Sequence, residues 1–171
     1  PYATAAAGPI LTLPLAGFFS IFGIGVMQVR LYMLLWLILL VSAAYFLIRS
    51  VAGRPAAFFA SLLFVTFSPL YANGKTATGD IPGFVALIFA LYYLYCRKWY
   101  GFSGILLALA ITTKPSLYMP VAVVALAEIF LSEAEEKWKH AVLVAGGSLL
   151  VLIPWFVSLV PQPIADGASW R

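Results

Sequence analysis

Uncharged apolar runs alternate with short polar stretches along most of this chain. Leu31 to Ile48 carries no charge and lies between Arg30 and Arg49, and Pro55 to Gly74 is equally uncharged. A membrane-spanning helix needs roughly 20 mostly apolar residues, because backbone polar groups in lipid must be hydrogen-bonded within the helix. Both runs are therefore predicted to be spans, the second beginning with Pro at a position that helices tolerate.

Two later runs have the same character. Ile81 to Cys96 follows Asp80 and ends before Arg97, while Ala141 to Val160 follows the charged stretch Glu133 to His140. Their length and apolar content predict two further spans. The charged stretch is predicted to be a solvated cytoplasmic loop.

Between these runs lie two shorter ones, Trp99 to Thr113 and Pro115 to Leu131, which Lys114 separates. They predict a helical hairpin. A helix over the first of them rises only about 22 Å, less than the roughly 30 Å of bilayer hydrocarbon. The turn at Thr112 to Pro115 is then expected to lie below the membrane surface and to face a protein cavity. Alternatively, Lys114 extends along its aliphatic stem to the headgroups.

The first 29 residues are uncharged but are interrupted by several Gly and Pro residues. An interfacial or re-entrant helix from Ile10 to Phe22, on the non-cytoplasmic face, fits these interruptions better than a straight crossing; a true span would place Pro1 in the cytoplasm. The predicted fold class is thus all-α, a polytopic transmembrane bundle of about six spans plus this helix. Residues 1–171 are expected to be one partial transmembrane domain, with 1–29 closing a first non-cytoplasmic loop, 30–160 forming the helices and 161–171 beginning another such loop.

Composition excludes a soluble globular domain. Hydrophobic residues make up 64% of the chain and charged residues 9%, against roughly half and roughly a quarter in soluble domains. The net charge of +4 comes from singly scattered basic residues, so no nucleic-acid surface is expected. Cys96 and His140 are each the only residue of their type, which excludes an internal disulfide and a Cys or His metal cluster.

Alternating assignment of the loops divides the basic residues into two groups. One side receives Arg49, Arg54, Arg97, Lys98, Lys137 and Lys139, and the other receives Arg30, Lys75, Lys114 and Arg171. The positive-inside rule places the first group in the cytoplasm. The chain is therefore expected to be a multi-pass integral membrane protein, in the plasma membrane or, in a prokaryote, the inner membrane.

The candidate chemistry gathers at the non-cytoplasmic helix ends. Asp80 follows Thr78-Gly79 at or next to the N-cap of a span, where the helix dipole favours a negative charge. Lys75 and Lys114, with Arg30, could surround the same mouth and bind an anionic ligand such as a lipid phosphate. The alternatives are that Asp80 only caps its helix and that the cations only contact headgroups.

The order of these features resembles the GT-C superfamily of membrane glycosyltransferases, in particular the protein mannosyltransferase and aminoarabinose transferase branch, or glycosyltransferase family 39 in the broad sense. The resemblance covers about residues 8 to 160 as weak, spaced matches. They are Gly8-Pro9 to Pro14, Phe22-Gly23, Arg30-Leu31, Ser68-Pro69, Gly79-Asp80, Gly104 to Thr113-Lys114-Pro115, and Pro154-Trp155.

The resemblance implies an inverting enzyme that passes a sugar from a polyprenyl-phosphate donor to a protein, lipid or glycan acceptor on the non-cytoplasmic face. It assigns Asp80, as a catalytic carboxylate, to the family's second acidic site, and Lys114 and Arg30 to basic positions near the donor phosphate. The family's general base would precede Pro1, and because Pro1 to Ala7 contains no acid, the chain is expected to be a fragment or processed chain without it. A divalent metal near the acids is a family property that one carboxylate does not suffice to predict.

Two other function classes fit the same pattern. A transporter or flippase also places charged groups and broken helices within the membrane, although no inverted repeat is visible across these residues. In a noncatalytic membrane subunit, Asp80 and Lys114 would only be residues at helix ends. The position of Asp80 relative to Lys114 separates these readings, because the enzyme requires both in one cavity.

Overall fold

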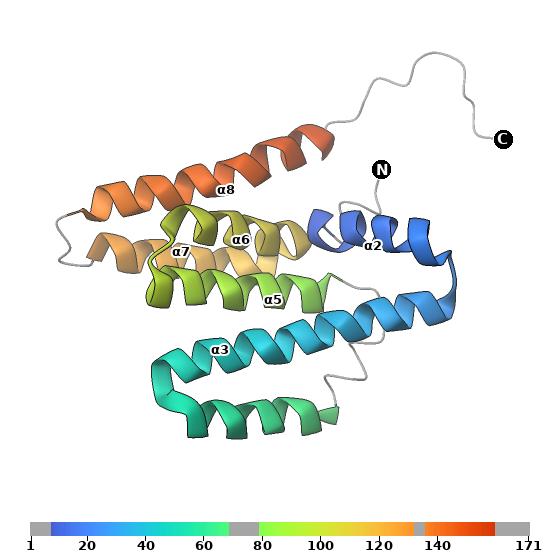
Figure 1. Cartoon of the computed structure of the whole chain (residues 1–171). Coiled ribbons are helices and arrows are strands. Elements are labelled where there is room, and N and C mark those ends of the chain that lie inside the picture. Colours follow the sequence, from blue (N-terminus) through green and yellow to red (C-terminus); the bar gives the residue numbers. More distant parts are fainter. Residues whose placement is uncertain (1–7, 69–78, 132–135, 160–171) are drawn as a thin grey trace, which may run out of the picture.

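The computed structural model describes residues 8–68, 79–131 and 136–159, and within these ranges every regular element is helical. The all-α prediction is confirmed. Predictions that concern residues 1–7, Lys75, 133–135 or 161–171 lie outside the described residues. The helices are α2 (Pro9–Phe22), α3 (Val26–Thr66), α5 (Asp80–Leu91), η1 (Tyr92–Arg97), α6 (Tyr100–Thr113), α7 (Pro115–Leu131) and α8 (Lys137–Leu159), where η1 is a π-helical continuation of α5 (Figure 1).

The first two predicted spans form the two arms of α3. The chain reverses between them at Gly53, whose φ of 85° and ψ of 176° lie outside the helical region (Figure 1). Glycine reaches this region without a steric penalty, and Pro55 can begin the second arm because the first residues of a helix have no partner for their N–H groups. The second arm ends at Thr66, with Phe67 as its C-cap, and residues 69–74 of the predicted run lie outside the described residues.

The predicted hairpin is also present. Lys98 adopts the left-handed conformation, with φ 57°, and separates η1 from α6. Lys114 is extended, with φ −146° and ψ 86°, and separates α6 from α7. This break follows from the sequence, because a residue before proline avoids the helical region and Pro115 then opens the next helix.

The last helix begins earlier than predicted. Residues Lys137 to His140 were expected to belong to a loop, but α8 starts at Lys137. The backbone N–H of His140 donates to the carbonyl oxygen of Glu136 at 3.1 Å, and the Lys139 ammonium lies 3.1 Å from the Glu136 carboxylate. A helix can continue into a charged segment as long as the charged side chains lie outside the lipid. The charged residues therefore indicated where the membrane ends, and not where the helix begins.

Helix α6 lies at the centre of the bundle and packs most extensively against α8 and α5. Gly147 of α8 lies so close to α6 that an added Cβ would be 3.0 Å from the carbonyl carbon of Gly101. The hydroxyl of Ser148 donates to the carbonyl oxygen of Gly104 at 3.0 Å, and that of Ser103 donates to the carbonyl oxygen of Ala90 at 2.9 Å. Small residues and hydroxyl hydrogen bonds are the usual means by which helices associate in membranes.

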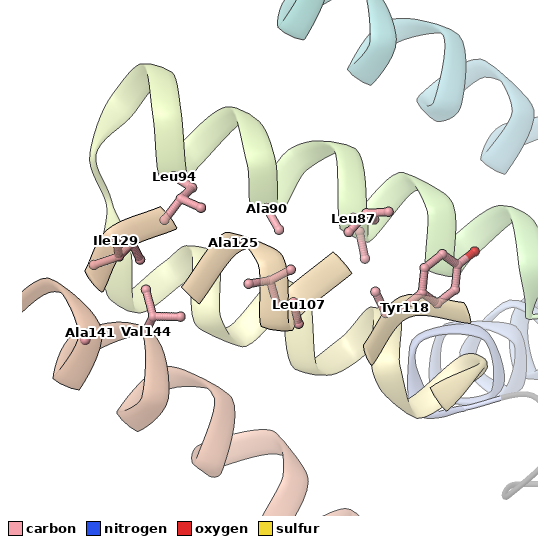
Figure 2. Packing of buried hydrophobic residues seen from close by; sticks show 12 residues of the cluster. Leu87, Ala90, Leu94, Leu107, Tyr118, Ala125, Ile129, Ala141 and Val144 are labelled. Carbon is pink, nitrogen blue, oxygen red and sulfur yellow. The ribbon is translucent and has the colours of Figure 1, made fainter. Parts of the chain in front are cut away.

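A hydrophobic cluster fills the space between α5, α6, α7 and α8, with Leu107 and Val144 at its centre (Figure 2). A second cluster joins α2, α3 and α5 through Leu11, Tyr32 and Ile81. The outer surface is apolar as well: Val51 is 75% exposed and Leu150 is 70% exposed. Such an exterior suits a lipid environment, because soluble proteins rarely expose contiguous apolar surface on this scale.

Three of the described helices are long and apolar enough to cross a membrane: Val26–Thr66, Asp80–Arg97 and Lys137–Ser158. Their length and composition fit the predicted integral membrane protein. The helices run back and forth, so that the starts of α3 and α5 lie at the same end of the bundle as the α6–α7 turn (Figure 1). The bend of α3, the η1–α6 turn and the start of α8 lie at the opposite end (Figure 1).

Candidate functional site

An ion pair joins two of the predicted site residues, which are far apart in sequence. The Nζ atom of Lys114, in the α6–α7 turn, lies 2.5 Å from Oδ1 of Asp80, the first residue of α5. Gly79 occupies the N-cap, and the Asp80 carboxylate makes no capping hydrogen bond. Capping therefore does not explain this carboxylate, although the helix dipole still favours its negative charge.

The backbone around the pair is held by contacts of its own. The hydroxyl of Tyr118, one turn into α7, donates to the backbone carbonyl oxygen of Asp80 at 3.1 Å, and Figure 2 shows this side chain reaching toward α5. Gly83 packs directly under Thr113 and Tyr118, where an added Cβ would lie 2.8 Å from the tyrosine ring. The start of α5 is thus fixed against the hairpin turn by packing that does not depend on the ion pair.

The side chains of the pair are partly exposed, although Oδ1 of Asp80 itself is buried. The side chain of Lys114 is 50% exposed and that of Asp80 is 39% exposed. Among the described residues, Oδ1 of Asp80 has no hydrogen-bond partner, so its contact with Lys114 is an ion pair without hydrogen-bond geometry. An ammonium has three N–H donors. Lys114 can therefore contact Asp80 and an additional anion at the same time.

The beginning of α2 closes one side of this region. Gly8 has a φ of 69° and lies against the end of α6, where an added Cβ would be 3.0 Å from the carbonyl oxygen of Thr112 and 2.9 Å from Cγ2 of Thr113. Both threonine side chains are buried. Gly8 is therefore a position where the backbones of α2 and α6 meet directly before Lys114, and a side chain would separate them.

An apolar groove of about 460 Å³ begins at the same place. Pro9 of α2, Leu109 of α6 and Trp155 of α8 line it, with Thr12, Leu13, Leu150, Val151, Pro154 and Ser158. The indole Nε1 of Trp155 is buried and has no hydrogen-bond partner among the described residues. The groove and the ion pair are linked through consecutive residues, because Pro9 follows Gly8 and Leu109 lies about one turn before Thr113.

The other two predicted site residues, Arg30 and Lys75, are not part of this ion pair. Arg30 lies in the first turns of α3, which extend beyond the start of α5 at this end of the bundle (Figure 1). It is exposed and forms no ion pair with a described residue. Tyr32, two residues further along, shares a hydrophobic cluster with Ile81, the neighbour of Asp80. Lys75 lies outside the described residues.

Two residues of the region were not singled out from the sequence. Tyr118 follows Lys114 by four positions and Gly83 follows Asp80 by three, which are the spacings that place residues on one helix face. That spacing was the available signal. The sequence could not reveal that these two helix faces contact each other.

The described residues contain no group of three His, Cys, Asp or Glu side chains that could bind a metal ion.

Comparison with known proteins adds one match. Residues 6–160 match the sequence model of the family described as dolichyl-phosphate-mannose-protein mannosyltransferase. This range contains every described helix and both members of the ion pair. No curated protein and no solved structure matches the chain significantly.

Proposed function

We propose that this chain, which belongs to the dolichyl-phosphate-mannose-protein mannosyltransferase family, forms the donor site of a membrane glycosyltransferase. The family is of the GT-C type. The proposed reaction moves a sugar from a polyprenyl-phosphate donor to a protein, lipid or glycan acceptor on the non-cytoplasmic face. The observation that carries the proposal is the accessible ion pair of Asp80 and Lys114 beside an apolar groove.

The chemistry requires a fixed cation. In an inverting transfer, an acceptor oxygen forms a bond to the anomeric carbon while the bond from that carbon to the phosphate oxygen breaks. The acceptor proton passes to a carboxylate base, and the polyprenyl phosphate leaves with the electron pair. A preorganised ammonium next to the leaving phosphate stabilises the charge that develops on it. Lys114 is the proposed cation, because its exposed ammonium is anchored at the hairpin turn.

Asp80 has a proposed place at the same donor site. Its contact with Nζ of Lys114 limits the positions that the ammonium can occupy, and its half-exposed carboxylate can also reach a ligand. It is the family's second acidic site according to the resemblance described above. Arg30 and Lys75 are proposed to add positive charge around the donor at the same membrane surface, where a phosphate would attract them at longer range.

The groove supplies the apolar part of the proposed donor site. A polyprenyl chain needs a hydrophobic surface that begins next to the cation binding its phosphate. The groove of about 460 Å³ is the proposed surface, since Pro9 lines it and the preceding Gly8 packs against Thr112 and Thr113, directly before Lys114. It is lined mainly by apolar side chains, as lipid-binding sites are.

A charge swap tests the proposal. The protein in liposomes would be supplied with polyprenyl-phosphate mannose and a Ser- and Thr-containing acceptor peptide. Release of polyprenyl phosphate would be measured for Asp80→Asn, Lys114→Gln and the double variant Asp80→Lys/Lys114→Asp. We expect each to lose activity by roughly 100-fold or more, the scale on which removal of an electrostatic stabiliser acts. The swap preserves an ion pair, so a purely structural role predicts that it restores activity.

Lys139→Gln is the matched control, because Lys139 is also an exposed lysine in an ion pair, at the opposite end of the bundle. It should retain full activity. Unchanged activity in Lys114→Gln, or recovery in the swapped variant, would remove Asp80 and Lys114 from the reaction. Movement of the donor across the bilayer without release of polyprenyl phosphate would instead support a flippase.

A further inference from the structure

Four basic side chains lie in two turns at the end of the bundle opposite Lys114. Arg49 and Arg54 flank the bend of α3, and Arg97 and Lys98 form the turn between η1 and α6 (Figure 1). All four are exposed. We call these four residues the basic cluster.

A direct contact brings the two turns together. The hydroxyl oxygen of Ser50 lies 3.0 Å from the sulfur of Cys96. Each of these residues is next to a member of the cluster, Arg49 in the first case and Arg97 in the second. Both turns also contain a residue with a positive φ, Gly53 at 85° and Lys98 at 57°. The fold therefore holds like charges close together, which is unfavourable unless an anion is bound between them.

The two carboxylates that the structure describes near this end, Glu128 and Glu136, do not pair with this charge. Glu128 of α7 accepts a hydrogen bond from the hydroxyl of Tyr95. Arg97, two positions after Tyr95, forms no ion pair with Glu128. Glu136, the other described carboxylate near this end, pairs with Lys139. None of the ion pairs between described residues involves the basic cluster.

Aromatic residues give the cluster a position relative to the bilayer. The guanidinium of Arg97 lies 5.9 Å from the ring centroid of Trp99, and Trp99 is 56% exposed. Exposed Trp and Tyr side chains concentrate at the headgroup level of membrane proteins. Trp99 and Tyr95 therefore place the basic cluster where phosphates of the lipid headgroups lie, at the surface opposite the proposed donor site.

We propose that the basic cluster is a binding site for the phosphate of an anionic phospholipid. The three arginines of the cluster, Arg49, Arg54 and Arg97, offer planar donors that match phosphate oxygens, and Lys98 adds charge. The acyl chains would lie against the apolar side chains of α3 and η1 next to the cluster. This site is separate from the glycosyl-transfer proposal, and neither depends on the other.

The test compares lipid binding between two variants of equal charge. Native mass spectrometry of the protein in neutral detergent would count bound phosphatidylglycerol against bound phosphatidylcholine. Arg54→Gln/Lys98→Gln removes half of the cluster. We expect phosphatidylglycerol binding to weaken about tenfold or more, from roughly fivefold per basic residue near an anionic surface. High salt should weaken the binding of phosphatidylglycerol to the wild-type protein to a similar extent, because the cluster is exposed and its charges are screened.

Lys137→Gln/Lys139→Gln is the control, since it removes the same charge at the same end of the bundle from the start of α8, where Lys139 already pairs with Glu136. This variant should change phosphatidylglycerol binding by less than about threefold, because both lysines lie outside the cluster and one of them is already paired with a carboxylate. Equal losses in the two variants would show a diffuse charge effect and overturn the site. Equal binding of phosphatidylglycerol and phosphatidylcholine to the wild-type protein would also overturn the site. Gel filtration and helicity that match the wild-type protein would show that each variant is folded.

Discussion

Replacing Gly147 by Ala should separate α8 from α6, the most extensive helix contact in the bundle. Gly147 is buried, and an added Cβ would lie 3.0 Å from the carbonyl carbon of Gly101 and 3.2 Å from the backbone nitrogen of Ile105. Backbone atoms cannot rotate away as a flexible side chain can. The carbonyl oxygen of Gly101 would lie closer still to the added Cβ, so the helices would need to move apart by about 1 Å or more to regain contacts of roughly 3.5–4.0 Å.

The cost follows from this displacement. Overpacking of a tightly packed interface costs about 1–3 kcal/mol, and the hydrogen bond from Ser148 to Gly104 would lengthen, at roughly 0.6 kcal/mol for a hydrogen bond within a membrane protein. The higher helix propensity of Ala returns up to about 1 kcal/mol. We therefore expect Gly147→Ala to lower the free energy of unfolding by about 1–2.5 kcal/mol.

Gly146→Ala is the matched control. The two glycines are consecutive in α8, but Gly146 is exposed and an added Cβ meets nothing within 4 Å. It should be neutral or stabilising by up to about 1 kcal/mol. Unfolding of both variants by sodium dodecyl sulfate in bicelles, followed by circular dichroism, measures the difference. Equal stability of the two variants would refute the proposed contact between the backbones of α6 and α8.

Two further substitutions test the turn and the site. Gly53→Ala should cost about 1–3 kcal/mol, because its φ of 85° and ψ of 176° are open almost only to glycine; Gly17→Ala, with open space and an ordinary φ, should be tolerated in the same unfolding assay. Tyr118→Phe removes the hydrogen bond to the Asp80 carbonyl and should cost about 0.5–1.5 kcal/mol. Tyr100→Phe should be neutral, because the Tyr100 hydroxyl forms no hydrogen bond with a described residue. An equal loss of stability in both tyrosine variants would contradict a stabilising hydrogen bond from Tyr118 to Asp80.

The helices and most of their ends followed from local rules. Uncharged runs between basic residues predicted the two arms of α3, and Pro115 predicted the break at Lys114. These features depend on lipid solvation and on backbone sterics. Both act over a few residues, so the local sequence is sufficient to predict them. The start of α8 at Lys137 was missed, since hydropathy locates the edge of the hydrocarbon, and a helix can continue beyond it.

The candidate site required the tertiary structure. The sequence identified Asp80 and Lys114 as unusual polar residues at helix ends, and alternating threading predicted that they share one end of the bundle. It did not determine that their side chains touch, or that Gly83 lets α5 lie under Tyr118, because such contacts depend on helix rotation and distance set by packing across the whole bundle. What the chain determines by itself is therefore which groups lipid would exclude, while only the packed bundle decides which of those groups meet.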